Sequence, residues 1–364
     1  MQNPLSDRLY HSRVKPRKPD IRGDYFRDQT AIIHSTPFRR LKHKTQVFFL
    51  PQNDHICTRI EHVLHVSTIA TTICKGLDLD VELAQAIALG HDLGHAPFGH
   101  IGEKTLSRLS KSTGGFIHEV HGLAVVDRIA NNGRGLNLTY AVRDGIVSHC
   151  GEAFTKSIQP ERKPKNLEAI SGRQSAPLTY EGCVVRVADK IAYLGRDIED
   201  AITVGLITPR DIPRDLKRSL GRTNGQIIDT LVMDVIRASF GKDRILFSDG
   251  RFDMLCRLKD FNYERIYKHP RLLESDRIIH RLLTEIHGHL TACMERLGQD
   301  EKAYAASKLR LVRHFGQFLS IRRGWKDTVH CTERCVVDFI AGMTDSYALE
   351  AAREILFPNP IELV

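Results

Sequence analysis

The segment HDLGHAPFGH, residues 91–100, places three histidines and an aspartate directly after the apolar run VELAQAIAL. His91 and Asp92 are adjacent, and His62 and Asp189 lie within other apolar helical patterns. A carboxylate in such surroundings is costly unless it is paired or bound to a metal. One divalent ion bound by these four residues would relieve the cost of burying them, and it would leave room for water or substrate oxygens.

Imidazole nitrogens and carboxylate oxygens suit borderline cations, so this set predicts Mn, Fe, Co, Ni or Zn, with Mg also allowed. The residue types leave a structural alternative open, with His62 as a hydrogen-bonded core histidine and Asp189 as an ion-pair partner. The glycines and the proline of the segment stop the helix, so we expect His95 and His100 to return towards the metal. Glu103 follows His100 by three residues, a spacing at which a carboxylate orients an imidazole if a helix begins here.

Helical periodicity dominates the chain and predicts a mostly α-helical fold with little or no sheet. Residues 59–77 carry one apolar stripe that includes His62, at steps of four, three and four. A short turn then leads into a helix over residues 81–92, which ends in the proposed metal-binding pair. Further helices are expected over residues 118–131, 136–149, 181–203, 226–240, 273–297, 300–319 and 330–356, with a weak strand signal at 245–249.

We expect residues 28–364 to form one helical domain, with the metal core at about 55–205 and a further helical part over 206–364. Residues 1–27 are basic and contain three prolines, which predicts an extended N-terminal arm that a neighbouring subunit orders. Residues 151–179 lack periodicity and also contain three prolines. A long loop of this kind inside a compact domain is often mobile or functional.

The composition is that of an ordinary globular protein of 364 residues, with 41% hydrophobic and 27% charged residues. No apolar run reaches the roughly 20 residues that a membrane span needs, and the N-terminus lacks the apolar core of a signal peptide. The eight cysteines are scattered along the chain, unlike a disulfide framework. We therefore expect a cytoplasmic protein that does not act at a membrane. The net charge of +9 predicts anionic partners, among them nucleotides, phosphates and nucleic acid.

Five segments resemble, in sequence and in order, the deoxynucleoside triphosphate triphosphohydrolase (dGTPase-like) family of the HD superfamily of metal-dependent phosphohydrolases. They are RDQTAIIHSTPFRRLKHKTQVF (27–48), RIEHVLHVS (59–67), GHDLGHAPFGHIGE (90–103), ADKIAYLGRDIEDA (188–201) and DFIAGMTDSYAL (338–349). The resemblance implies an all-α HD-domain fold. It also implies that water attacks the α-phosphorus of a dNTP with the help of a metal, releasing a deoxynucleoside and tripolyphosphate.

The family resemblance implies that four further residues act in catalysis around the metal. His100 would protonate the departing 5′-oxygen of the nucleoside, and Glu103 would keep the pKa of His100 high. His95 would stabilise charge on the α-phosphate, and His118 matches a family histidine near the phosphates. The metal itself maps onto His62, His91, Asp92 and Asp189.

A second group of residues is implied to bind the substrate. Arg59 lies three residues before His62, hence on the same helix face, and a guanidinium suits phosphate oxygens. Lys190 would neutralise the distal phosphates, and Tyr193 would pack against C2′ of the sugar and exclude ribonucleotides. The segment 338–349 is a family feature to which we assign only a structural role. The residues implied for the sugar, its 3′-hydroxyl or the base are Gln46, Asp197 and Tyr267.

Two other functions remain open. One is an HD phosphatase or phosphodiesterase acting on deoxynucleoside monophosphates or cyclic nucleotides. Such an enzyme should lack the equivalents of Lys190, Tyr193 and the segment KTQV (44–47), all of which this chain contains. The other is a nucleotide-sensing or single-stranded nucleic-acid-binding protein, whose affinity would fall steeply with salt.

The resemblance also implies a homo-oligomer, a tetramer or a hexamer, with a dNTP activator bound at a subunit interface. Basic residues of the arm and of the C-terminal part are the candidates for such a site, and solvated surface charge is the alternative explanation for them. These residues are Arg13, Lys15, Arg17, Lys18, Lys308, Arg310, Arg313, Arg322 and Arg323.

Overall fold

The computed structural model describes residues 1–49, 54–151, 154–173, 175–322 and 332–357. Within these ranges the chain is mainly helical, and its only sheet pairs two short antiparallel strands, β1 (Ser157–Ile158) and β2 (Ile245–Leu246). This confirms the predicted all-α fold. None of the helices in the described ranges is both long and apolar enough to cross a membrane.

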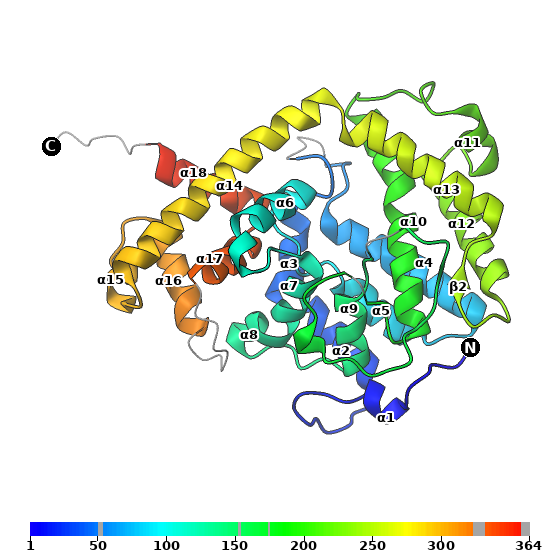
Figure 1. Ribbon diagram of the computed structural model, residues 1–364, viewed down its shortest axis with the longest axis horizontal. Helices are drawn as coiled ribbons and strands as arrows, with labels where there is room; N and C mark the ends of the chain where they lie inside the picture. The colour runs from blue at the N-terminus through cyan, green and yellow to red at the C-terminus, as the bar shows by residue number, and fades with distance from the viewer. Residues whose placement is uncertain (50–53, 152–153, 174, 323–331, 358–364) are drawn as a thin grey trace.

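Figure 1 shows the order and placement of the helices. The N-terminal half contains α1 (Asp7–Tyr10), α2 (Asp24–Ile33), α3 (Thr36–Arg40), α4 (Arg59–Leu77), α5 (Val81–Gly90), α6 (Gly99–Leu109), α7 (His118–Ala124), α8 (Ala130–Gly133) and α9 (Tyr140–Val147). The C-terminal half contains α10 (Tyr180–Thr203), α11 (Arg214–Ser219), α12 (Asn224–Ser239), α13 (Asp249–Asn262), α14 (Pro270–Leu297), α15 (Glu301–Ala305), α16 (Arg310–Arg322), α17 (Thr332–Ala341) and α18 (Asp345–Leu356).

Three of these helices, α4, α5 and α10, carry or directly precede the predicted metal ligands, and each begins at a side-chain cap. At the start of α4, the Glu61 carboxylate accepts a hydrogen bond from the Thr58 N–H at 2.6 Å. The Asp80 carboxylate before α5 and the Thr179 hydroxyl before α10 each accept a bond of 3.0 Å from a backbone N–H of the first turn. Such caps satisfy donors that a helix leaves unpaired, so the local sequence sets where each helix starts.

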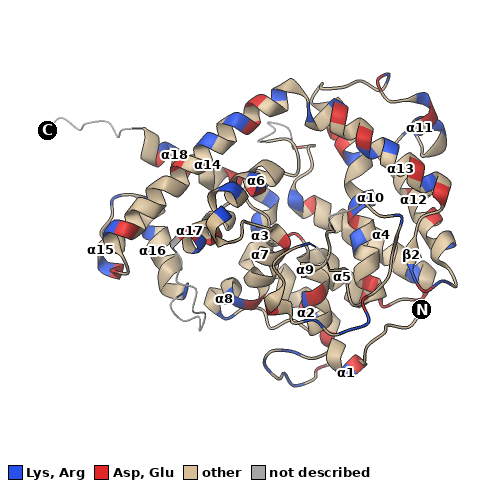
Figure 2. Cartoon of the chain, viewed as in Figure 1, with Lys and Arg blue, Asp and Glu red and all other residues tan. Residues whose placement is uncertain are grey.

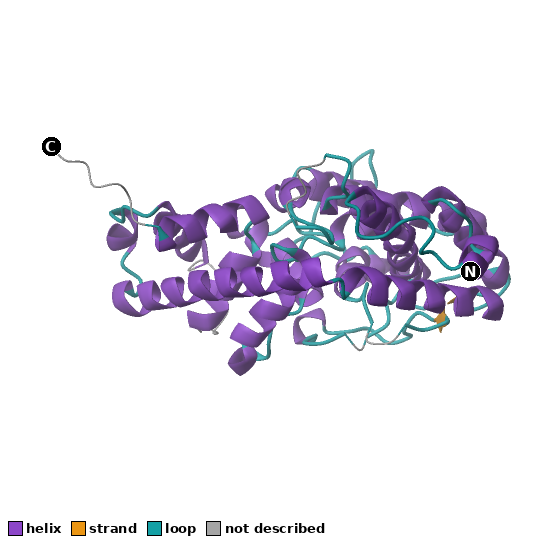
Figure 3. Ribbon diagram, turned by 90° about the horizontal axis from the view of Figure 1, so that it is seen from above, coloured by secondary structure: helices purple, strands orange, loops and turns teal. Residues whose placement is uncertain are grey.

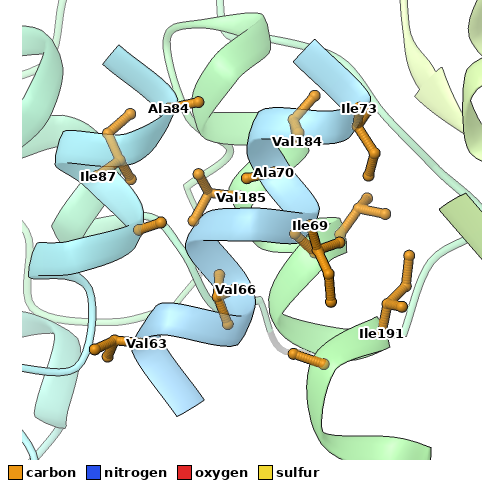
Figure 4. Close-up of a cluster of buried hydrophobic side chains, with 14 of the residues drawn as sticks. Val63, Val66, Ile69, Ala70, Ile73, Ala84, Ile87, Val184, Val185 and Ile191 are labelled. Carbon is orange, nitrogen blue, oxygen red and sulfur yellow. The ribbon is translucent and has the colours of Figure 1, made fainter. Parts of the chain in front are cut away.

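The same three helices share one apolar core, shown in Figure 4. The stripe predicted on residues 59–77 is buried in α4 and faces apolar side chains of α5 and α10. Burying one Val or Ile side chain contributes about 1.5–3 kcal/mol, so this packing strongly sets the rotation of each helix and the direction of its polar residues. The labelled core residues are Val63, Val66, Ile69, Ala70, Ile73, Ala84, Ile87, Val184, Val185 and Ile191.

A second apolar cluster lies in the C-terminal part of the chain. One face of α14 buries Ile279, Leu283, Ile286 and Leu290, and α14 packs against α6, α17 and α18. In Figure 1, α14 runs diagonally from the end of α13 to the group of α15–α18, and Figure 3 shows the same long helix from above. Because α6 begins within the segment HDLGHAPFGH, this cluster supports the turn that carries the predicted catalytic histidines.

Three helices predicted from periodicity are interrupted in the structure. The helix expected over residues 300–319 is divided into α15 and α16. The helix expected over 330–356 is divided into α17 and α18, with the Thr344 hydroxyl capping α18; residues 330 and 331 lie outside the described ranges. The helix expected over 118–131 is α7 followed by a wider helical turn. Periodicity continues across such breaks because the consecutive pieces face the same core.

Part of the N-terminal arm, residues 1–27, is tied to helices of its own chain, and the ordering of the arm by a neighbouring subunit stays a prediction. The arm contains the short helix α1, and α2 already begins at Asp24. The Arg13 guanidinium donates to Asp28 at 2.5 Å and to Asp24 at 3.0 Å, and the Tyr10 hydroxyl donates to a carbonyl just before α10. Two carboxylates therefore neutralise Arg13 and tie the arm to α2.

Candidate active site

The structure brings the four predicted metal ligands together. His62 Nε2 lies 3.0 Å from Asp189 Oδ1 and 3.9 Å from Asp92 Oδ2. His91 Nε2 lies 3.3 Å from Asp92 Oδ1 and 3.9 Å from Asp189 Oδ1. All but Asp189 are almost fully buried. These four residues, the metal-ligand cluster, form a compact polar centre at the edge of an apolar core.

The chemistry of the cluster fits a divalent cation. The His91 Nδ1–H donates to the Ala88 carbonyl at 2.6 Å, which leaves Nε2 with a lone pair, and this buried atom has no hydrogen-bond partner among the described residues. Burial raises the pKa of Asp189, but the hydrogen bond with His62 and nearby histidine charges outweigh it and hold that pKa well below its usual range. Burial likewise raises the pKa of Asp92, and neighbouring histidines and an arginine outweigh it. Anionic oxygens and free imidazole nitrogens are the donors that Mn, Fe, Co, Ni and Zn prefer.

Glu103 faces His118, which corrects the expectation that it orients His100. The Glu103 carboxylate lies 2.9 Å from His118 Nδ1 and 2.5 Å from Arg173 Nη2. The pKa of His100 is lowered, because the surrounding protein and then the Arg59 charge outweigh the opposing charge of Glu103. The reason is geometric, since Glu103 is buried on the side of α6 that meets α7, whereas His100 keeps an exposed surface.

His95 and His118 stack beside the metal-ligand cluster, with ring centroids 3.7 Å apart. His95 Nε2 lies 3.2 Å from Asp92 Oδ1. Gly94 permits this approach, because a Cβ at that position would lie 2.1 Å from the His118 carbonyl oxygen. The ring of His100 lies further out, 6.2 Å from that of His95. Two of the three predicted catalytic histidines therefore line the polar centre, and the third lies at its exposed side.

His149 also belongs to this centre, although it was not among the residues predicted from the sequence. Its Nδ1–H donates to the Ile146 carbonyl at 2.7 Å, and its ring centroid lies 4.9 Å from that of His91. The sequence did contain an indication of this role, because His149 lies at the end of an apolar helix, α9, just as His91 lies at the end of α5. What the sequence did not show is that the ends of α5 and α9 meet.

The loop over residues 151–179 supplies a second residue that the sequence did not indicate. Arg173 forms an ion pair with Glu103 at 2.5 Å and with Glu119 at 2.7 Å. Both carboxylates are buried beside His118. The loop, of which residues 152, 153 and 174 lie outside the described ranges, thus brings a cation that neutralises these carboxylates. No periodicity or motif marked Arg173 in advance.

The predicted substrate residues of α10 continue from the metal-ligand cluster along the helix. Lys190 directly follows Asp189, and its Nζ lies 4.7 Å from the ring centroid of Phe154. Lys259 Nζ approaches the same ring at 5.1 Å. Burial, followed by the charge of Arg186, lowers the pKa of Lys190 to about 8. Two ammonium groups therefore flank one aromatic ring next to the cluster, of which the sequence had singled out only Lys190.

Tyr193 and Asp197 follow one and two turns beyond Asp189, and Tyr267 joins them from the segment after α13. The Tyr267 hydroxyl donates a hydrogen bond to Asp197 Oδ2. Burial, together with the charge of Asp200, raises the pKa of Asp197 to about 7. The Tyr267 hydrogen bond and the nearby histidine and arginine charges lower this pKa, but they offset the increase only in part. The structure thus places Tyr267 beside Asp197, and the resemblance had implied both residues for binding the nucleoside.

Replacing Asp197 with asparagine is expected to remove a pH dependence of stability. The folded-state pKa of about 7 lies above the value of about 3.9 in an unfolded chain, so the folded protein retains a proton between these values. Below about pH 4, the Asp197 carboxyl makes its full contribution to the free energy of unfolding. This contribution is lost as the pH rises to about 7, and the loss between pH 5 and pH 8 is about 3 kcal/mol. In urea unfolding, the free energy of unfolding of Asp197→Asn should therefore rise relative to that of the unsubstituted protein by the same amount between pH 5 and pH 8. A difference that does not change with pH would contradict the buried, protonated carboxyl.

Arg59 and Gln46 lie next to the start of α6 with buried polar atoms that lack partners. Arg59 Nη1 forms an ion pair with Asp92 Oδ2 at 2.6 Å, while Nη2 and Nε have no hydrogen-bond partner in the described part of the chain. The same holds for Gln46 Oε1. A Cβ at Gly99 would lie 3.0 Å from the Gln46 carbonyl oxygen and 3.5 Å from Arg59 Nη2. Such orphaned groups call for an absent partner, and a bound phosphate or sugar would supply one.

Asp345, the first residue of α18, holds the turn of residues 91–100 in place. Its two carboxylate oxygens accept hydrogen bonds from the Phe98 N–H and the Thr45 N–H, each at 2.8 Å, and Asp345 is buried. Phe98 has a φ of 61°, a left-handed conformation that residues other than glycine rarely adopt. The C-terminal segment that the sequence left without a chemical role therefore supports the turn between His95 and His100.

Several of the basic residues suggested for an activator site already have carboxylate partners within the chain. Arg310 and Arg322 form ion pairs with carboxylates of the C-terminal helices at 2.5 and 2.8 Å, and Arg323 lies outside the described residues. Arg17 and Arg39 line a cavity of about 920 Å³. Figure 2 shows basic and acidic residues alternating along α13 and α14. An activator site therefore stays a prediction.

The fold and the converging histidines and aspartates define a class of protein that comparison with known families also identifies. The model of the HD domain matches residues 59–194, and that of the phosphohydrolase-associated domain matches residues 318–354. The first match contains the whole metal-ligand cluster, and the second contains Asp345. The protein is an HD-domain phosphohydrolase.

More particularly, the chain belongs to the family of deoxyguanosinetriphosphate triphosphohydrolase-like proteins. One such protein, from Caldanaerobacter subterraneus subsp. tengcongensis, is 38% identical over 361 residues, covering 98% of this chain and 93% of the relative. A relative from Desulfatibacillum aliphaticivorans is 37% identical, and the match covers 96% of this chain and 92% of the relative. A relative from Clostridium perfringens is 36% identical, and the match covers 95% of this chain and 91% of the relative. The resemblance drawn from five segments is thus confirmed over nearly the whole chain.

Proposed function

We propose that the protein hydrolyses deoxynucleoside triphosphates to deoxynucleoside and tripolyphosphate. The observation that carries this proposal is the continuity of α10, in which Asp189 of the metal-ligand cluster is followed by Lys190, Tyr193 and Asp197. A nucleotide with its α-phosphate at the cluster would meet a cation for the distal phosphates and an aromatic and a polar side chain for the sugar. The names of the relatives, as deoxyguanosinetriphosphate triphosphohydrolase-like proteins, support the same reaction.

The metal-ligand cluster would hold one divalent cation, which supplies Lewis-acid stabilisation of charge on the α-phosphate when bound. His95, stacked on His118, would stabilise the same charge from the protein side. The free Nη2 and Nε of Arg59 would donate to phosphate oxygens, and Lys190 and Lys259 would neutralise the distal phosphates. Cationic and donor groups would thus surround the whole triphosphate.

His100 is the proposed proton donor to the departing 5′-oxygen of the nucleoside. It lies in the first turn of α6, next to His95, and keeps an exposed surface towards which a substrate can approach. Proton transfer by a positioned histidine typically contributes about 10²–10⁴-fold to a rate. Because Glu103 is engaged with His118 and Arg173, it would act on His100 only through its charge, which burial and the charge of Arg59 outweigh in setting the His100 pKa.

The sugar end of the site is proposed to select deoxyribose. Tyr193, half-buried on α10, would pack against C2′ and leave no space for a 2′-hydroxyl. Asp197 and Tyr267 are already hydrogen-bonded to each other and would receive the 3′-hydroxyl, and the orphaned Gln46 Oε1 would approach the sugar from the other side. This half of the site would distinguish the proposed substrate from phosphate esters without a nucleoside.

Product analysis tests the proposal. The purified protein is incubated with Mn²⁺ and each dNTP, singly and as a mixture, and in parallel with ribonucleotides, deoxynucleoside monophosphates and cyclic nucleotides. Deoxynucleoside plus tripolyphosphate is the expected pair of products, and turnover only in the mixture would reveal an activating nucleotide. Monophosphate plus pyrophosphate would place the attack at another bond. Turnover of monophosphates or cyclic nucleotides alone, or salt-dependent binding of single strands without any dNTP product, would overturn the proposal in favour of the other two functions.

A further inference from the structure

We propose that Arg186 binds the terminal phosphate of the substrate, together with the ammonium groups of Lys190 and Lys259. The inference deepens the proposed function and rests on it, because it takes a triphosphate bound at the metal-ligand cluster as its starting point. Arg186 lies on α10, three residues before Asp189 and four before Lys190. Residues three and four apart are neighbours on the surface of a helix, so Arg186 lies next to both.

The first argument is that Arg186 is a buried cation without a carboxylate partner in the described part of the chain. Only 8% of the residue is exposed. Its Nη1 donates to the Ser175 carbonyl at 3.1 Å and to the Ser148 carbonyl at 3.5 Å, while its buried Nε has no hydrogen-bond partner among the described residues. The nearby Glu119 already forms an ion pair with Arg173 at 2.7 Å. A buried charge is costly unless it is paired, so Arg186 lacks an anion.

The second argument is the concentration of positive charge around Arg186. Lys190 follows it by one helical turn, and the Nζ atoms of Lys190 and Lys259 lie 4.7 and 5.1 Å from the ring centroid of the same residue, Phe154. Burial and then the charge of Arg186 lower the pKa of Lys190, and the charge of Lys259 adds to this effect. Like charges that are close together repel each other. A polyanion bound beside the metal-ligand cluster would offset this repulsion.

The third argument is the order of the groups along α10. The α-phosphate is proposed to lie at Asp189, and the sugar at Tyr193 and Asp197, one and two turns further along the helix. The other phosphates of a dNTP extend from the α-phosphate away from the sugar, which along α10 is the direction of Arg186. At 1.5 Å per residue, Arg186 lies about 4.5 Å before Asp189 along the helix axis. Arg186 is therefore at the end of the site where a terminal phosphate would lie.

The surroundings of the guanidinium suit this role. Gly151 lies against it, and a Cβ at that position would lie 1.3 Å from Arg186 Nη2, so only glycine fits there. Gly151, Ser175 and Lys190 are only partly buried, which places Arg186 close to the surface rather than in the apolar core. Nε and Nη2 form one edge of the planar guanidinium, and such an edge can donate two parallel hydrogen bonds to phosphate oxygens.

The binding of inorganic tripolyphosphate tests this proposal without a nucleoside and without turnover. The protein with its bound metal is titrated with tripolyphosphate in a calorimeter, with the same excess of Mn²⁺ in both solutions. Loss of the charged hydrogen bonds should weaken binding by about 10–100-fold in Arg186→Met, while the metal content stays unchanged. Arg186→Lys keeps the charge but not the planar fork and should bind about threefold more weakly. If Arg186→Met does not fold, an Arg186→Lys protein with undiminished affinity would overturn the proposal.

Kinetics locate the contact within the nucleotide. In dNTP hydrolysis, Arg186→Met should raise KM by the same factor as the dissociation constant of tripolyphosphate and leave kcat unchanged, because the contact is made equally in the ground state and the transition state. A deoxynucleoside diphosphate lacks the terminal phosphate and should inhibit both proteins with the same inhibition constant. An inhibition constant that rises as much as KM would overturn the assignment to the terminal phosphate.

Arg196→Met is the matched control. Arg196 lies on the same helix at the sugar end of the site and forms a partly exposed ion pair with Glu199 at 3.2 Å, so this variant should bind tripolyphosphate as tightly as the unsubstituted protein does. Equally tight binding by Arg186→Met would overturn the inference and leave the proposed function intact. Tripolyphosphate binding that depends on Arg186, in a protein that hydrolyses no dNTP, would support this phosphate site and overturn the proposed function.

Discussion

Replacing Asp189 with asparagine is expected to remove bound metal and dNTP hydrolysis together. Asp189 Oδ1 lies 3.0 Å from His62 Nε2 and 3.9 Å from His91 Nε2, so it joins the two imidazoles of the cluster. A neutral amide loses the anionic oxygen that a divalent cation requires. Since a catalytic metal supplies several kcal/mol and each 1.36 kcal/mol is tenfold in rate, turnover should fall on the order of 10³-fold or more. Metal content and product formation, measured on the same preparation, check both parts.

Glu199→Gln provides the control for this substitution. It makes the same change from carboxylate to amide on the same helix, at a residue that forms a partly exposed ion pair with Arg196 at 3.2 Å. Exposed pairs of this kind contribute about 0–1 kcal/mol, so this variant should keep its metal and its activity. An Asp189→Asn protein with full metal content and full turnover would remove the basis of the metal assignment.

Replacing Asp345 with alanine is expected to destabilise the fold and to slow catalysis, although Asp345 does not touch the metal-ligand cluster. The substitution leaves the N–H groups of Phe98 and Thr45 without their acceptor. A hydrogen bond to a charged group contributes about 1.5–3 kcal/mol, so the free energy of unfolding should fall by about 3 kcal/mol or more. Because Phe98 lies between His95 and His100, turnover of the protein that remains folded should fall about tenfold through displacement of these histidines. Urea unfolding and the initial rate of hydrolysis measure the two effects.

Two other variants of α18 serve as a milder substitution and as a control for this prediction. Asp345→Asn keeps one oxygen that can accept a hydrogen bond and should lose about half as much stability. Glu350→Ala removes an exposed ion pair with Arg310 on the same helix and should change stability by less than about 1 kcal/mol. If Asp345→Ala is as stable and as active as Glu350→Ala, the carboxylate does not hold the turn of residues 91–100.

The metal-ligand cluster was predictable from the sequence because its residue types conflict with their surroundings. His62 and Asp189 lie within apolar helical patterns, where an ionisable side chain is unfavourable unless something binds it. The adjacent pair His91 and Asp92 adds two potential ligands at a helix end. Local periodicity then identified the helices that carry these residues, since a buried face repeats along a helix. These signals need no knowledge of how distant helices pack.

The pairing of the remaining polar residues was less predictable. The spacing of Glu103 from His100 allowed a contact within α6, but α7 brings His118 against the buried side of the helix, and Glu103 pairs there instead. His149 had the same local setting as His91, and Arg173 had no signal at all. In each case the partner lies on another element, and a local pattern cannot report which elements meet.

The sequence by itself determined the helical class of this protein, the residues that can bind a metal and the family to which the chain belongs. Each of these follows from residue types and short-range spacing. Only the tertiary structure decided that His118 faces His149, that Arg173 neutralises two buried carboxylates and that Asp345 holds the turn at Phe98. Those contacts join residues from different helices and loops. Their geometry depends on how two apolar clusters pack together, which is a property of the whole chain rather than of any segment.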